Sequence, residues 1–222
     1  MITPRLECII NHTNGKKIAD IGTDHAYIPI YMIQNNLAES FIAGDVRKGP
    51  VDIAKNNVKK HNLTDKIDVR LGSGLSVLKK GEVDTIIIAG MGGQLISEII
   101  DADISIAREC SLVLQPMNGQ YELRHYLHKN GFTITNEDIV IEGFKVYNII
   151  NAKNGKQDEF QTDIEYHLPK YLKSNKYYID LYRKKHREFT KVIKGLELSK
   201  DTDIEKLEQY KFWLKELEKY EN

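Results

Sequence analysis

The sequence predicts an α/β protein with a Rossmann-like, doubly wound seven-stranded sheet and a C-terminal antiparallel helical hairpin of the coiled-coil type. Three observations lead to this prediction. Short apolar strand segments alternate with amphipathic helical segments up to about residue 130. Two strand segments, 132–140 and 144–151, then follow each other directly. From His167 onward the chain is helical in pattern and strongly charged.

The composition limits the class of protein. The 222 residues carry 32 basic and 32 acidic side chains, so attraction to nucleic acid has to come from local segregation of charge. Cys8 and Cys110 lack the spacing of a metal or redox motif, and we expect reduced cysteines and no metal centre. No apolar run approaches the roughly 18 residues of a membrane span. These features predict a soluble cytoplasmic protein that does not enter a membrane.

The first predicted helix and strand indicate where a cofactor binds. Apolar residues at helical intervals predict a short helix over residues 4–11, with Arg5 at its exposed start. The apolar run 18–21 is typical of a buried parallel strand, and Gly22 permits a tight turn into the next helix. Because ligands of open α/β sheets bind beyond the carboxyl ends of the strands, a cofactor is expected at residues 20–26.

The remaining elements continue the alternation. Strands are predicted at 40–45, 67–71, 83–89 and 111–115, and helices at 49–61, 75–78, 94–100 and 121–129. The run 83–89 is the most apolar, which predicts a central parallel strand covered on both faces. Glu142 and Gly143 are expected to join the last two strands into an antiparallel hairpin.

The turn after the first strand indicates the charge of the ligand. A pyrophosphate site needs several glycines and free backbone N–H groups, whereas this turn offers one glycine between Asp20 and Asp24. The two carboxylates would repel an anion and favour a cationic sulfonium beside an ammonium group. This pattern indicates S-adenosylmethionine and not NAD or ATP. Asp45 ends the second strand at about the offset where a carboxylate accepts ribose hydroxyls.

Four strand ends are predicted to meet around one site, at Asp20 to Gly22, Asp45, Gly72 to Gly74, and Ala89 to Gly93. At these residues the sequence resembles class I S-adenosylmethionine-dependent methyltransferases. The segments 18–30 (IADIGTDHAYIPI) and 89–93 (AGMGG) resemble one family in particular, the bacterial tRNA adenine-N1 methyltransferases that modify A22 in the D arm (TrmK). The resemblance extends over almost the whole chain. It departs from the general glycine pattern at Asp24 and Ala26, and an aspartate tolerates a left-handed backbone better than most residues.

The resemblance implies an enzyme that methylates N1 of an adenine in tRNA. It implies cofactor contacts at Asp20, Gly22, Thr23, His25, Asp45, Val46, Gly72, Ser73, Gly74, Ala89, Gly90 and Met91. It also implies a catalytic face at Asp24, His25 and Tyr27. Other acceptors remain open, among them ribosomal RNA, a protein or a small molecule. A non-catalytic adaptor that uses the coiled coil is the third alternative, but a scaffold would need none of the acidic and glycine positions.

Each catalytic candidate has a structural alternative. Adenine N1 carries an in-plane lone pair, so attack needs no base, and Asp24 could stabilise the positive charge that develops on the ring. Asp24 could also only cap the following helix. His25 could be a proton carrier or a structural residue, and Tyr27 could stack on a flipped base or lie in the core. Gln115, before Pro116, could line the acceptor pocket or simply end its strand.

Basic side chains are concentrated in residues 165–196, which hold nine Lys or Arg against three acids. This segregation is what phosphate binding requires. The candidate RNA-binding side chains are Arg183, Lys184, Lys185 and Arg187, with Arg5 and Gln115 nearer the cleft. The alternative is a solvated coiled-coil face that pairs with the more acidic second helix.

The chain divides in composition after the predicted sheet. We expect a cofactor-binding methyltransferase domain over residues 1–155 and a helical, tRNA-binding extension over 156–222. One helical register aligns an apolar stripe formed by Leu172, Ile179, Tyr182, Phe189, Ile193 and Leu196. Because the hairpin can bury this stripe against its own second helix, we expect a monomer.

Overall fold

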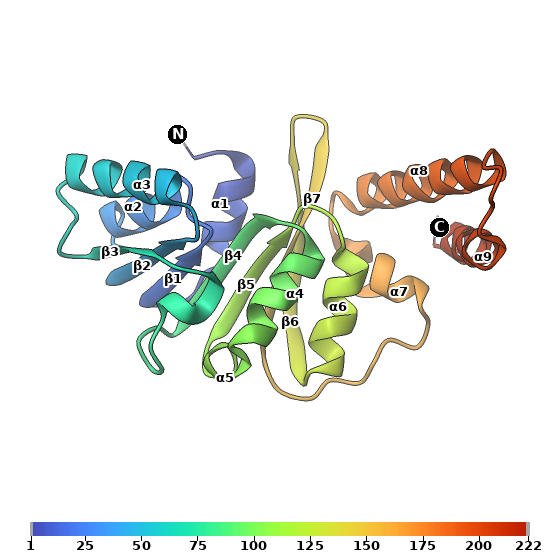
Figure 1. Ribbon diagram of the computed structural model, residues 1–222. Coiled ribbons are helices and arrows are strands. Elements are labelled where there is room, and N and C mark those ends of the chain that lie inside the picture. The colour runs from blue at the N-terminus through green and yellow to red at the C-terminus, as the bar shows by residue number, and fades with distance from the viewer. Residues whose placement is uncertain (1, 221–222) are drawn as a thin grey trace.

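A seven-stranded sheet with helices on both faces forms the centre of the computed structural model, which describes residues 2–220 (Figure 1). The strands are β1 (Lys17–Ile21), β2 (Ser40–Asp45), β3 (Ile67–Leu71), β4 (Thr85–Met91), β5 (Ser111–Pro116), β6 (Phe132–Glu142) and β7 (Lys145–Asn154). Their order is β3-β2-β1-β4-β5-β7-β6, with β7 antiparallel to both of its neighbours. The order reverses between β1 and β4, where doubly wound sheets bind their ligands.

Helices cover the two faces of the sheet in separate layers. One face carries α1 (Pro4–Asn11), α2 (Tyr27–Gln34) and α3 (Lys48–Lys60). The other carries the 3₁₀ helix η1 (Gly74–Val77) and helices α4 (Gly93–Ala102), α5 (Ile104–Ala107) and α6 (Gln120–Lys129). The apolar strand β4 serves both layers, since Ile87 packs into the first core and Ile86 and Ile88 into the second. Among residues 2–220 no helix combines the length and apolar character needed to cross a bilayer.

All seven strands were predicted from the sequence, and the differences concern their ends. β4 starts at Thr85 and continues to Met91, because it keeps pairing with β5 beyond a bulge between Ala89 and Met91. The hairpin strands β6 and β7 are longer than expected, and the turn between them contains Gly143 with φ +60°. The four-residue helix α5 was not predicted, because it is too short to show a helical period.

The C-terminal part contains α7 (Ile164–His167), the 3₁₀ helix η2 (Lys170–Ser174), α8 (Tyr178–Glu197) and α9 (Ile204–Glu218). Helices α8 and α9 pack as a hairpin in which the Phe189 and Trp213 rings lie 5.9 Å apart. Asp203 caps α9 by accepting the Lys206 N–H at 3.0 Å.

The apolar stripe of the hairpin differs from the prediction. Leu172 lies before α8, in η2, and Ile179 is 37% exposed, whereas Leu181 is fully buried. The stripe is shifted because α8 packs against the strands β6 and β7 as well as against α9. Ile139 and Val146 of these strands share one apolar cluster with the residues of both helices. The expectation that the hairpin buries its stripe by itself was therefore incomplete.

A buried polar cluster centred on Glu137 of β6 joins this extension to the sheet. Arg124 of α6 and Glu137 form an ion pair in which neither side chain is exposed to solvent. Arg124 also donates to the carbonyl of Tyr166 at 2.5 Å, and the hydroxyl of Tyr171 donates to Glu137 at 2.7 Å. Asn148 of β7 adds a third donor to the carboxylate. The cluster therefore connects α6, α7, η2 and both hairpin strands.

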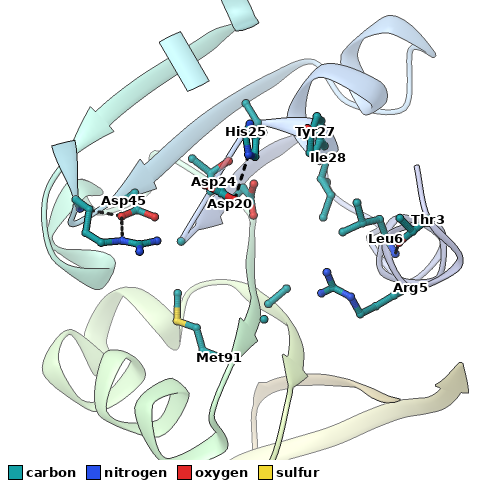
Figure 2. Close-up of a pocket in the computed structure, with 16 residues that line it drawn as sticks. Thr3, Arg5, Leu6, Asp20, Asp24, His25, Tyr27, Ile28, Asp45 and Met91 are labelled. Atoms are coloured by element: carbon teal, nitrogen blue, oxygen red, sulfur yellow. Dashed lines mark hydrogen bonds and ion pairs between the residues drawn. The ribbon is translucent and has the colours of Figure 1, made fainter. Parts of the chain in front are cut away.

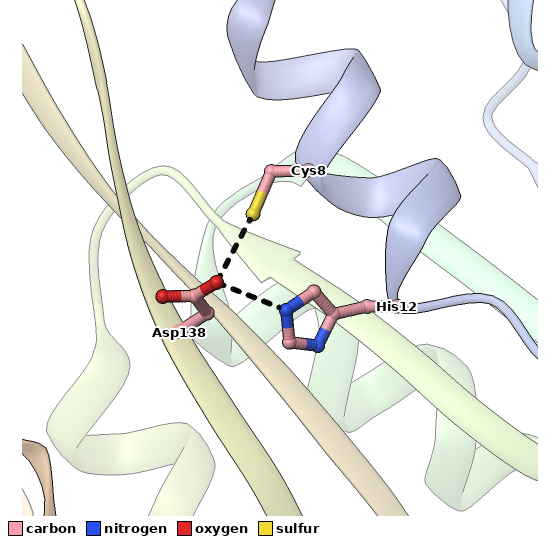
Figure 3. A group of neighbouring side chains, drawn as sticks. All are labelled: Cys8, His12 and Asp138. Atoms are coloured by element: carbon pink, nitrogen blue, oxygen red, sulfur yellow. Dashed lines mark hydrogen bonds and ion pairs between the residues drawn. The ribbon is translucent and has the colours of Figure 1, made fainter. Parts of the chain in front are cut away.

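A second polar cluster, centred on Asp138, holds α1 on the other face (Figure 3). His12 Nε2 lies 3.1 Å from Asp138 Oδ2, and the Cys8 thiol lies 3.8 Å from the same oxygen. Burial, together with Asp138, raises the pKa of Cys8 to about 12, so the thiol keeps its proton at neutral pH. Asn175 donates to the second oxygen of Asp138. Residues distant in sequence thus position α1, which closes one side of the cleft described below.

The buried pair predicts a large stability effect. Arg124→Leu should lower the free energy of unfolding by about 3–5 kcal/mol, because it leaves the Glu137 carboxylate buried without its counter-ion. Lys80→Ala breaks the exposed pair with Glu109 and should cost less than about 1 kcal/mol. Denaturant unfolding monitored by circular dichroism measures both. If Arg124→Leu lowered the free energy of unfolding no more than Lys80→Ala does, the buried pair would not be important for the stability of the fold.

Candidate active site

A cleft of about 480 Å³ opens where β1, β2 and β4 end, at the switch in strand order (Figure 2). Thr3, Arg5 and Leu6 of the α1 segment border the cleft at one end, and Asp45 lies at the other. The cleft brings together most of the predicted site residues, namely Asp20, Gly22, Thr23, Asp24, His25, Tyr27, Asp45, Ala89, Gly90, Met91 and Arg5. Ala26, in the segment 20–26 where a cofactor is expected, also lines the cleft, and Thr3, Leu6, Ile28 and Arg47 complete the lining without having been predicted.

Three aspartates, Asp20, Asp24 and Asp45, give the cleft its negative charge. Asp20, on β1, is 7% exposed, and burial raises the pKa of its carboxyl to about 6, with a smaller contribution from Asp45. Asp45, at the end of β2, is 6% exposed and accepts the backbone N–H of Arg47 at 2.8 Å. The guanidinium of Arg47 approaches the same oxygen, Oδ1, so the other oxygen is left for a ligand. The arrangement suits a cation whose attached sugar presents hydroxyl groups.

A smaller cavity of about 290 Å³ adjoins the cleft. It shares Gly22, Asp45, Arg47 and Met91 with the cleft and contains the predicted Val46, Gly72, Ser73 and Gly74. Leu95 and Ile99 of α4 supply an apolar wall that the sequence did not reveal. Leu95 is 48% exposed although it is apolar. An apolar slot of this kind, beside a carboxylate that can accept sugar hydroxyls, suits the base of a nucleoside.

The glycine after β1 is required by close packing. Gly22 has φ +83°, and a Cβ at this position would lie 2.1 Å from the terminal methyl carbon of Met91. The side chain of Met91 can therefore lie across the turn, where both cavities share it. Any larger residue at Gly22 would displace Met91 and strain the backbone.

The segment from Asp24 to Tyr27 stands at the mouth of the cleft. The Asp24 carboxylate is 64% exposed and lies 3.3 Å from Nε2 of His25. The rings of His25 and Tyr27 are stacked, with centroids 5.0 Å apart and planes inclined by 15°. Tyr27 is 46% exposed, so the alternative that places it in the core is wrong.

Two expectations about the backbone at this turn are wrong. Asp24 does not cap α2, because the N-cap position is occupied by Ala26 and no side chain caps the helix. The left-handed residue is also Ala26, with φ +55°, and not Asp24. Asp24 therefore neither caps α2 nor takes the left-handed conformation, and its carboxylate is exposed at the mouth of the cleft.

Arg5 lines the cleft, and Gln115 holds it there. Gln115 is completely buried, and its Oε1 accepts a hydrogen bond from Nη1 of Arg5 at 2.7 Å. The guanidinium also lies over the Tyr147 ring, 5.7 Å from its centroid. Gln115 is thus not a lining residue, in contrast to the prediction, because its side chain is buried behind Arg5. It orients the residue that does reach the cleft.

The predicted basic residues of α8 divide into two groups. Arg183 and Arg187 are exposed and, with Lys191 and Lys194, form one exposed stripe at helical spacing, here called the α8 basic stripe. Lys184 instead donates to the carbonyl of Val146 at 2.9 Å. Lys185 is 5% exposed and pairs with Glu188, so it does not present its charge beside the two arginines. The ion pair between the hairpin helices joins Glu197 of α8 to Lys211 of α9 and leaves the stripe unneutralised.

The raised pKa of Asp20 makes a prediction about stability. Since the pKa of Asp20 is about 6 in the folded protein, well above the ordinary value of an aspartate, the folded state loses stability as pH rises from 4 to 6. Above pH 6 the whole penalty of about 3 kcal/mol is present. Asp20→Asn should remove it and raise the free energy of unfolding at pH 7.5, with a smaller gain at pH 4.5.

Denaturant unfolding at the two pH values measures this effect. Asp65→Asn, which removes an exposed carboxylate before β3, is the control for the loss of one negative charge. An Asp20→Asn variant that is less stable than the wild type at pH 7.5 would contradict the assignment.

Comparison with known proteins identifies the family. A family model described as TrmK, tRNA (adenine(22)-N(1))-methyltransferase, matches residues 18–220. The chain is 41% identical over 160 residues to the tRNA (adenine(22)-N(1))-methyltransferase of Bacillus subtilis (strain 168), which covers 71% of this chain and 67% of that protein. The crystal structure of B. subtilis TrmK superposes with a TM-score of 0.82 and 32% identity, and covers 100% of this chain and 96% of that one.

Two further solved structures contain the cofactor or its product. Streptococcus pneumoniae Sp1610 in complex with S-adenosyl-L-methionine has a TM-score of 0.88 and 29% identity, with full coverage of both chains. M. capricolum TrmK in complex with S-adenosyl-homocysteine has a TM-score of 0.84 and 28% identity, covering 99% of this chain and 97% of that one. With its family match over residues 18–220, its acidic cleft and its C-terminal helices, this chain belongs to the TrmK family of tRNA (adenine(22)-N(1))-methyltransferases.

Proposed function

We propose that this protein methylates N1 of adenine 22 in tRNA, with S-adenosylmethionine as the methyl donor. The observation that carries the proposal is the cleft at the switch in strand order, where Asp20, Asp24 and Asp45 converge below one wall of stacked rings. Membership of the TrmK family supplies the acceptor and its position. The alternative of a non-catalytic adaptor explains neither the buried Asp20 nor the glycine required at position 22.

The chain fits the cofactor on three counts. The carboxylates suit a sulfonium and an ammonium group, Asp45 keeps one oxygen for ribose hydroxyls, and the slot beside Leu95 and Ile99 suits an adenine ring. Asp20 and Asp24 would hold the cationic end, with Gly22, Thr23, Ala89 and Gly90 allowing close approach. When bound, S-adenosylmethionine supplies a methyl group that is activated on a positively charged sulfur.

The acceptor end of the cleft lies between α1 and the start of α2. Arg5 and Leu6 border one side, and Tyr27 with His25 borders the other. A flipped adenine fits between an apolar surface and a stacked aromatic pair. Arg5, held by Gln115, is placed to contact a phosphate of the same RNA strand.

Asp24 has the electrostatic role in the reaction. The N1 lone pair attacks without prior removal of a proton, so position and charge supply the acceleration. Positive charge then develops on the adenine, and the Asp24 carboxylate at the mouth of the cleft stabilises it. His25, 3.3 Å from that carboxylate, steadies its orientation while its ring continues the wall formed by Tyr27.

The C-terminal helices are proposed to hold the RNA. In this division, residues 1–155 bind the cofactor and residues 156–222 provide the tRNA-binding extension. Support comes from the α8 basic stripe, whose side chains are exposed and aligned. Phe189 of α8 and Trp213 and Leu217 of α9 are buried in one apolar cluster within the chain, which supports a monomer. A tRNA substrate implies that the protein works in the cytoplasm.

Methyl transfer from labelled S-adenosylmethionine to unmodified bacterial tRNA tests the function. The label should be recovered in 1-methyladenosine after digestion to nucleosides, and replacement of adenosine 22 by guanosine should abolish it. If the protein binds the cofactor but leaves tRNA unlabelled, the acceptor is a different molecule.

Asp24→Asn should lower kcat about tenfold, because it removes the charge that stabilises the methylated ring. The effect should lie below the 100-fold or more that is typical of buried electrostatic groups, since solvent screens a carboxylate that is 64% exposed. Cofactor affinity, measured by calorimetry, should change less than the rate. Asp52→Asn on the surface of α3 is the matched control. An unchanged kcat would refute the electrostatic role.

Arg183→Gln combined with Arg187→Gln should weaken tRNA binding and reduce the slope of log K against log salt by up to about 2, because each arginine releases counter-ions from a phosphate. Arg108→Gln, which changes an exposed arginine just after α5, should leave the slope unchanged. Fluorescence anisotropy at several salt concentrations measures the slopes. Equal slopes for the double variant and the wild type would locate the RNA elsewhere.

A further inference from the structure

A third cavity, of about 530 Å³, lies outside the wall of the cleft, between α2 and α3. We call it the α2–α3 groove and define it by Tyr27, Tyr31, Gln34, Asn57, Lys60 and His61. Tyr27 and Tyr31 are 46% and 38% exposed, which is unusual for rings that pack within a fold. Of these six residues, Tyr27 alone also lines the cleft.

The groove and the cleft share one wall. His25 and Tyr27 line both cavities, and their stacked rings separate them. Asn57 of α3 donates to the backbone carbonyl of His25 at 3.0 Å, which ties the groove to the turn that carries Asp24. A chain that places one unit in the cleft can therefore place its next unit in the groove without leaving the surface.

The side chains of the groove match the parts of a nucleotide. Tyr31 offers a flat apolar face on which a base can stack. Gln34 Nε2 and His61 Nδ1 are hydrogen-bonded to each other at 3.1 Å, and the remaining polar atoms of the two side chains, Gln34 Oε1 and His61 Nε2, can serve the edge of a base. Lys60 supplies a positive charge for a phosphate, and none of the described residues that line the groove is acidic.

We infer that the α2–α3 groove binds a nucleotide adjacent to the adenosine that is methylated. The inference rests on the proposed function, since it needs an RNA in the cleft. An enzyme that removes a base from its stack must accommodate the neighbours that the base leaves behind, and single-stranded RNA is commonly held by stacking on aromatic side chains. The groove thus contributes to the recognition of the flipped strand, separately from the distant α8 basic stripe.

Substitutions of Tyr31 and Lys60 test the inference. Tyr31→Ala should lower kcat/KM for tRNA about 5–100-fold, mainly through KM, because it removes one base-stacking surface. Tyr31→Phe, which keeps the ring, should retain most of the activity. Lys60→Gln should weaken tRNA binding, whereas Lys66→Gln, an exposed lysine outside the groove, should not. Cofactor affinity and thermal stability, measured in parallel, should be unchanged in all of these variants.

RNA substrates that lack single bases identify the occupant. Two tRNAs are prepared, one with an abasic site immediately 5′ and one with an abasic site immediately 3′ of adenosine 22. One of them should reduce kcat/KM of the wild type to the level of Tyr31→Ala with intact tRNA. With that same RNA, Tyr31→Ala should cause no additional loss, because the two changes remove the two partners of one contact.

The outcomes separate the two proposals. No methylation of tRNA by the wild-type protein would overturn the proposed function and the nucleotide site with it. Methylation by the wild type together with an unaffected Tyr31→Ala variant would overturn only the nucleotide site. The nucleotide site would also be overturned if Tyr31→Ala lowered kcat/KM by the same factor with each abasic RNA as with intact tRNA. Tyr31 would then contact something other than a neighbouring base.

Discussion

Two adjacent carboxylates on the edge strand β6 connect parts of the protein that the sheet does not join by itself. Side chains of a strand alternate between its faces, so Glu137 and Asp138 point to opposite layers. Glu137 forms an ion pair with Arg124 of α6, and Asp138 pairs with His12 at the C-terminal end of α1. Segment 171–175 reaches both carboxylates, through Tyr171 and Asn175. The position of the cleft's outer wall and the docking of the C-terminal helices therefore depend on one strand.

The sequence predicted the sheet and most of the site for a topological reason. Parallel strands end at one edge, so residues placed at those ends, such as Asp20 and Asp45, had to meet whatever the packing. Features that depend on long-range packing could not be predicted in this way. The bond from Arg5 to Gln115 joins residues 110 positions apart. Leu95 and Ile99 looked like ordinary positions of an amphipathic helix, because periodicity does not say which helical residues border a cavity.

The errors in the C-terminal part have a different origin. A charged residue on a helix is expected at the surface, but α8 packs on β7 as well as α9 and so buries a wider face. Lys185 is buried on the side of α8 that faces the start of α6, where Gln120 and Glu188 accept from its ammonium group. At the turn before α2, the choice of the left-handed residue depended on how the chain enters the helix. Ala26 takes it, although glycine and aspartate have the stronger intrinsic tendency.

The apolar cluster that unites β6, β7, α8 and α9 has a consequence for substrate selection. Because these helices share a core with the sheet, the basic stripe and the cleft cannot move independently, as they could if a flexible linker joined them. Under the proposed function this fixed separation has a consequence. An RNA held on the α8 basic stripe would place its adenosine in the cleft only when the distance between the held backbone and that adenosine matches the separation.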